Sequence, residues 1–124
     1  MPKRSTIAAQ DIRPLATGKG SCLASDRITV AGKRVGFMYR EPADNTLDSG
    51  WRFFSGEESQ DFADDPNNFE IYDVNTIANY DPDIIPFLDE PAFSAFERES
   101  TSSKFVRSDF PGLSSLGCPS PPYH

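Results

Sequence analysis

The sequence predicts one α+β domain built on a mostly antiparallel sheet of about five or six short strands, with short helices inserted between the strands. Two observations lead to this fold class. A chain of 124 residues suits one hydrophobic core. Short apolar and aromatic runs alternate with turn residues and helix-capping residues, and no internal repeat orders them.

The first two predicted strands cover residues 21–25 and 35–40. Both are short runs with apolar residues, and the Gly32-Lys33 pair marks the turn between them. These two strands start the predicted sheet.

A third strand is predicted over residues 51–55 and is entered through a turn at residues 48–50. Side chains alternate between the two faces of a strand. The prediction therefore places Trp51 and Phe53 on one face, and Arg52 and Phe54 on the other.

A capping box predicts a short helix after this strand. The Ser55 hydroxyl would accept from the Glu58 amide while the Glu58 carboxylate reaches back, which starts a helix that runs to about Ala63. Residues 65–68 then break the chain, and residues 69–73 form a fourth predicted strand.

The following segment is predicted to be helical. Residues 74–79 form a helical turn with an apolar side, and Asp81 with Pro82 starts a helix that runs to about Leu88. Pro86 lacks a backbone donor, so we expect a kink or two short turns there.

A hairpin of residues 95–99 and 104–107 closes the predicted domain. The domain covers residues 21–107. Residues 1–20 lack periodicity, and residues 108–124 are rich in Pro, Ser and Gly, so both ends are predicted to be flexible.

Charge is distributed very unevenly along the chain, whose net charge is −7. Residues 1–40 contain eight bases and two acids, whereas residues 41–99 contain sixteen acids and only two bases, Arg52 and Arg98. A dense negative field attracts a basic partner and speeds the encounter. A simpler interpretation of this acidic segment is that it forms a solubilising face of the domain.

The candidate partner-binding residues come from this acidic segment. They are Glu57, Glu58, Asp61, Asp64, Asp65, Asp73, Tyr80, Asp81 and Asp83. Aromatic residues are numerous for so small a domain, so Phe54 or Tyr80 is a further candidate for an interface anchor.

The sequence offers no catalytic or metal-binding motif. The only histidine is His124 at the end of the predicted tail, and the two cysteines, Cys22 and Cys118, are expected to be free thiols. We therefore expect no catalytic residues, no metal and no cofactor. Acid pairs such as Asp64 with Asp65, or Asp81 with Asp83, leave a divalent-metal enzyme as the weaker alternative.

Gly50, Trp51 and Arg52 are predicted to be structural. Gly50 would supply a special backbone angle, Trp51 would fill the core, and Arg52 would pair with a carboxylate such as Asp73.

Location and partner class follow from composition. No apolar stretch approaches the about 18 to 20 residues that cross a bilayer, so we expect a cytoplasmic protein that binds no membrane. Phosphates would be repelled by the acidic segment, so nucleic acid is not an expected partner.

Three strings resemble a bacterial protein family. They are Gly-Phe-Met-Tyr-Arg-Glu at residues 36–41, Asp-Ser-Gly-Trp-Arg-Phe-Phe-Ser-Gly at residues 48–56, and Ile-Tyr-Asp-Val-Asn-Thr-Ile-Ala-Asn-Tyr-Asp at residues 71–81. The chain resembles, over about residues 22–106, the thirty-third group of immunity proteins of polymorphic toxin systems, formerly a domain of unknown function. This resemblance implies a protein that binds and neutralises a cognate toxin, without a shared catalytic set. A regulatory or scaffold module with an unrelated protein partner is the main alternative.

Overall fold

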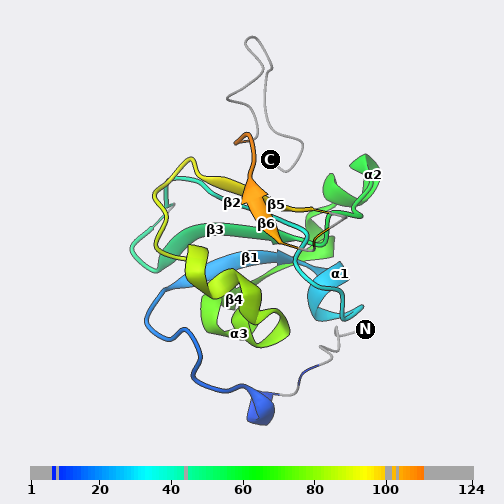
Figure 1. The fold of residues 1–124 in the computed structure, drawn as a ribbon. Coiled ribbons are helices and arrows are strands. Elements are labelled where there is room, and N and C mark those ends of the chain that lie inside the picture. The colour runs from blue at the N-terminus through cyan, green and yellow to red at the C-terminus, as the bar shows by residue number, and fades with distance from the viewer. Residues whose placement is uncertain (1–6, 8, 44, 100–101, 103, 111–124) are drawn as a thin grey trace.

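The computed structural model describes residues 7, 9–43, 45–99, 102 and 104–110. Their strands form a six-stranded sheet in the order β4-β1-β3-β2-β5-β6 (Figure 1). The strands are β1 (Ser21–Ser25), β2 (Phe37–Arg40), β3 (Asp48–Phe54), β4 (Phe69–Asp73), β5 (Ala95–Arg98) and β6 (Phe105–Arg107). The helices are α1 (Asp26–Thr29), α2 (Gln60–Ala63) and α3 (Val74–Tyr80), with 3-10 turns η1 (Ala9–Asp11), η2 (Pro66–Asn68) and η3 (Pro82–Phe87).

The sheet confirms the predicted fold class. Every neighbouring pair of strands is antiparallel except β1 and β3, which are parallel. None of the helices in the described part of the chain has the length and apolar character to cross a membrane.

The strand order was not predicted, and the turn expected at Gly32-Lys33 does not join neighbouring strands. β3 lies between β1 and β2 in the sheet, and β1 pairs with β3 and β4. Helix α1, which the sequence analysis missed, follows β1 directly, because the Ser25 hydroxyl accepts a hydrogen bond from the Arg27 amide (3.1 Å) and caps it. The connection from β1 to β3 covers residues 26–47, contains this helix and β2, and is long enough for the parallel pairing.

The turn predicted at residues 48–50 is also wrong, because β3 already begins at Asp48. Gly50 lies inside the strand with φ = +88°, and a Cβ there would lie 2.1 Å from the Glu41 carbonyl oxygen. Glycine thus permits the close approach of the strand to residue 41. The predicted alternation of β3 side chains is confirmed, with Trp51 and Phe53 in one cluster and Phe54 in another.

Helix α2 begins four residues later than the capping box predicted. The Glu58 carboxylate does reach back to the Ser55 amide (2.8 Å), but the Ser55 hydroxyl accepts from Glu57 (3.1 Å). Those bonds close a local turn. The helix is instead capped by Ser59, whose hydroxyl accepts from the Phe62 amide (3.1 Å).

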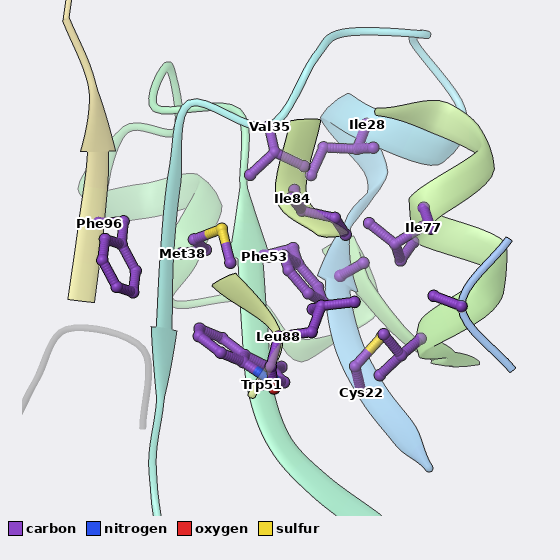
Figure 2. Packing of buried hydrophobic residues seen from close by; sticks show 14 residues of the cluster. Cys22, Ile28, Val35, Met38, Trp51, Phe53, Ile77, Ile84, Leu88 and Phe96 are labelled. Atoms are coloured by element: carbon purple, nitrogen blue, oxygen red, sulfur yellow. The ribbon is translucent and has the colours of Figure 1, made fainter. Parts of the chain in front are cut away.

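The main core lies between one face of the sheet and the segments α1, α3 and η3 (Figure 2). Sheet residues such as Met38, Trp51 and Phe53 pack there against Ile28, Ile77, Ile84 and Leu88, all nearly inaccessible to solvent. These covering segments include the helical turns predicted over residues 74–79 and 82–88. The second of them, η3, is a 3-10 helix that contains Pro86.

A second, smaller cluster lies on the opposite face of the sheet. Tyr39, Phe54 and Ala95 are buried there. Phe110, just beyond β6, packs edge-on against the Tyr39 ring with centroids 5.4 Å apart. The segment that follows the predicted hairpin therefore contributes to this cluster as far as Phe110, and the predicted tail from residue 111 lies outside the described residues.

The N-terminal segment is attached to α3, which the sequence analysis did not expect. The Asn75 carboxamide accepts from the Leu15 and Ala16 amides (both 2.8 Å) and donates to the Arg13 carbonyl (2.8 Å). Ala16 is buried in the main core. The Asn79 carboxamide also accepts from the Arg13 amide (2.9 Å), so two side chains of α3 supply partners for this irregular stretch of backbone.

Candidate functional site

One end of the sheet collects most of the acidic side chains. β1 and β3 are parallel, so their carboxyl ends lie at the same end of the sheet, and α1 and α2 follow there (Figure 1). β4 begins at this end and α3 returns to it, because the Asp81 carboxylate accepts from the Val35 amide (3.0 Å). We call this surface the α2 end and define it as residues 26–36, 55–69, 80–83 and 97–99.

The α2 end has a strongly negative net charge. Its residues include ten acids and four bases, a net −6 against −7 for the whole chain. Eight of the nine predicted contact residues lie here, and the exception is Asp73 at the far end of β4, about 13 Å along the strand. The Asp73 carboxylate accepts from the Asn75 amide (2.9 Å) and so caps α3.

The acids around α2 point their charge towards solvent. Asp61, Asp64 and Asp65 are exposed, and their bonds are local: Asp64 accepts from the Gln60 side chain (2.8 Å) and Asp65 from the Asn67 amide (2.9 Å). Glu57 lies 3.9 Å from the Lys33 amine, and both side chains are more than half exposed. Because this ion pair is exposed, Lys33 reduces the negative field around Glu57 only weakly.

Glu58 is the least available acid of this group. Its two carboxylate oxygens accept from the Ser55 and Gly56 amides (2.8 and 3.0 Å). It also lines an open hollow of about 270 Å³ together with Phe37, Phe54 and Glu97. The charge at this hollow therefore comes from a fixed carboxylate and the exposed Glu97.

Asp81 and Asp83 belong to an internal ion-pair network around Arg98. The Arg98 guanidinium donates to Asp81 and to Asp83 (3.2 Å), and Arg34 also reaches Asp83 (2.9 Å). Hydrogen bonds from Arg98 and then from Arg34 lower the pKa of Asp83. Asp81 is only 3% exposed, which corrects its assignment as a contact residue.

The two predicted aromatic anchors also serve the fold. Phe54 is 2% exposed and packs in the second cluster, so it is not an interface anchor in this structure. Tyr80 is half-buried, and its hydroxyl donates to the Thr29 carbonyl (3.2 Å) and accepts from the Ile7 amide (3.1 Å).

The acid pair Asp81 and Asp83 is not open to a cation. Arg98 donates to both Asp81 and Asp83, so a positive charge already occupies the place where that acid pair would hold a cation. Over the described residues, no three potential metal ligands gather. Burial raises the pKa of the free Cys22 thiol far above its ordinary value, and Cys118 and His124 lie outside the described residues.

A second ion-pair network lies at the other end of β3. Arg52, only 6% exposed, donates to Glu41 (2.6 Å) and Asp48 (2.9 Å), whereas the sequence analysis named Asp73 as its partner. Burial by itself lowers the pKa of Arg52, but hydrogen bonds with Asp48 and Glu41 outweigh it and raise the value. Trp51 is buried beside it and donates its indole N–H to the Leu88 carbonyl (3.1 Å).

Sequence reasoning did not identify Arg98 as the centre of a network, although a signal was present. Arg52 and Arg98 are the only bases among residues 41–99, and each of them is surrounded by carboxylates in the fold. A rare base within an acidic segment thus marked a structural ion pair in both cases.

The comparison with protein families gives one match. The sequence profile described as "Immunity protein Imm33 domain" matches residues 22–109. Neither a curated protein nor a solved structure matches the chain. The matched stretch runs from β1 past the end of β6 and includes the α2 end.

Proposed function

The chain belongs to the Imm33 immunity-protein family, and on this premise we propose that it binds and neutralises a cognate protein toxin without catalysing a reaction. The observation that carries the proposal is the family match over residues 22–109. An immunity protein acts by occupying its toxin, and this role needs a complementary surface and no reactive group of its own.

We propose the α2 end as the contact surface. The carboxylates Asp61, Asp64 and Asp65, with Glu57 beside them, support this assignment because all are exposed. The hydrogen bonds of Asp64 and Asp65 are local and leave their charge facing solvent. A field of one sign raises the association rate with an oppositely charged protein.

The partner that suits this surface has a basic face. A basic cleft is what an enzyme acting on nucleic acid presents to its substrate phosphates, so a nuclease toxin is the partner class that we favour. The acidic chain would occupy that cleft in place of the substrate.

The test is a calorimetric titration against the toxin encoded beside the gene. The triple variant Asp61→Asn, Asp64→Asn, Asp65→Asn keeps the size and capping ability of these side chains and removes three charges. We expect a dissociation constant at least about tenfold weaker, from a loss of about 0.5 kcal/mol or more per charge at low salt. Binding should also weaken as salt is added.

The matched control removes three charges elsewhere, with Asp11→Asn, Asp89→Asn and Asp109→Asn, all at exposed positions. This variant should bind within about twofold of the wild-type chain. Equal weakening by both triple variants would reject the α2 end as the contact surface. A chain that binds no neighbouring toxin would instead favour the regulatory or scaffold module.

A further inference from the structure

Within the described part of the chain, β4 forms one edge of the sheet and pairs with β1 alone. All five of its residues have register partners on β1, from Ser21 with Asp73 to Ser25 with Phe69. No strand of the described chain lies on its other side. The backbone groups on that side are therefore the ones available to another polypeptide.

Two hydrogen bonds establish which β4 residues point their backbone outwards. The Val74 amide donates to the Gly20 carbonyl (2.9 Å), in register with the β1–β4 ladder, and the Ser21 amide donates towards β3, to the Leu47 carbonyl (2.7 Å). Bonded and non-bonded pairs alternate along an antiparallel ladder. Glu70 and Tyr72 therefore bond to β1, and the amide and carbonyl of Ile71 point away from the sheet.

The Ile71 side chain is accessible as well. It is 72% exposed, one of the most exposed large apolar side chains in the described chain. β4 contains no proline or lysine, two residues that commonly block an edge strand. An exposed apolar side chain with outward amide and carbonyl groups is the arrangement that an added strand recognises.

Charge selects the kind of strand that can be added. Asp73 on β4 is exposed, and Asp64 and Asp65 lie just before the strand at the α2 end. These acids repel a second copy of a chain with net charge −7 and attract a strand that carries Lys or Arg.

We infer that the β4 edge pairs with an extended basic strand of the partner, with Ile71 at the centre of the new ladder. This inference rests on the proposed function, because the strand belongs to the toxin. It adds a mode of recognition: backbone hydrogen bonds along β4 hold the strand, and the α2 end attracts its charge.

Amide hydrogen exchange followed by NMR tests the inference on the full chain, alone and with the toxin encoded beside the gene. In the free chain the Ile71 amide should exchange rapidly and the Tyr72 amide slowly. In the complex, exchange at Ile71 should slow at least about tenfold, because a hydrogen-bonded amide exchanges only on opening.

A complex in which Ile71 exchanges as fast as in the free chain would overturn the inference and leave the proposed function intact. If no complex forms, the proposed function fails and the inference fails with it. Concentration-dependent protection of Ile71 in the free chain would show pairing with a second copy and would also overturn it.

Variants at the same position give an independent test. Ile71→Pro removes the outward amide without removing a β1–β4 hydrogen bond, and should weaken toxin binding about tenfold. Ile71→Val keeps both backbone groups and should bind within about twofold of the wild-type chain. A folded proline variant that binds like the valine variant would contradict strand pairing.

Discussion

Replacing Arg52 with alanine should cost about 3 to 5 kcal/mol of the free energy of unfolding. The guanidinium lies 2.6 Å from a Glu41 oxygen and 2.9 Å from an Asp48 oxygen. The side chains of Arg52, Glu41 and Asp48 are only 7%, 16% and 8% exposed. Alanine would therefore leave two poorly solvated carboxylates without their counter-ion, and this desolvation cost dominates the expected loss.

Urea unfolding followed by the fluorescence of Trp51 measures the effect. With a urea m value of about 1.5 kcal/mol per molar, the midpoint should fall by about 2 to 3 M. Arg34→Ala is the matched control, because Arg34 and its partner Asp83 are 55% and 56% exposed, and it should cost less than about 1 kcal/mol. A loss below about 1 kcal/mol for Arg52→Ala would refute the reasoning. If the variant does not fold, Arg52→Lys should still lose about 1 to 2 kcal/mol, because lysine keeps the charge without the planar fork of donors.

Three further predictions concern other parts of the fold. The pKa of Asp83 is lowered in the folded chain, so its ion pairs stabilise the fold above the unfolded-state pKa of about 3.9, and this contribution is lost as pH falls through the folded value. An NMR titration should give Asp83 a lower pKa than that of an ordinary aspartate, and Arg98→Gln should raise the pKa of Asp83. Asn75→Ala should cost about 2 to 3 kcal/mol and speed amide exchange at Leu15 and Ala16, and unchanged exchange there would contradict the proposed attachment of the N-terminal segment. Gly50→Ala should lower the free energy of unfolding, measured by thermal unfolding, by about 3 kcal/mol or more, because the added Cβ would lie 2.1 Å from the Glu41 carbonyl oxygen. Gly18 also has a positive φ, but a Cβ there would have nothing within 4 Å, so Gly18→Ala should cost only about 1 kcal/mol.

Elements that carry their own start signals could be predicted from the sequence. Asp81 is such a signal: its carboxylate accepts from the amide two residues ahead, and η3 begins at Pro82 as predicted. Asp73 caps α3 in the same way, a role that the sequence analysis did not assign to it. The strand at residues 69–73 and the closing hairpin also have a local signal, because their short apolar runs lie between turn residues.

Errors arose where distant segments decide the outcome. The pairing of β1 with β3 depends on which apolar strand occupies the centre of the sheet, and a local turn at Gly32-Lys33 contains no information about that choice. Capping at Ser59, in place of Ser55, shows that two local signals can compete within five residues.

The candidate site was predicted in part. The acids of residues 57–65 are local in sequence, so they gather at one end of the fold wherever that segment lies. Asp81 was assigned to the same surface, but its carboxylate accepts a hydrogen bond from Arg98, which lies 17 residues further along the chain. This ion pair keeps the Asp81 carboxylate inside the fold. The partner of a charged side chain is a tertiary property, and spacing in the sequence does not reveal it.

The central claim is neutralisation, and its most direct measurement is the activity of the neighbouring toxin with increasing amounts of the purified chain. The account predicts complete loss of toxin activity at an equimolar ratio, with much weaker inhibition by the Asp61, Asp64 and Asp65 triple variant. A toxin that stays fully active beside an excess of the folded wild-type chain would contradict it.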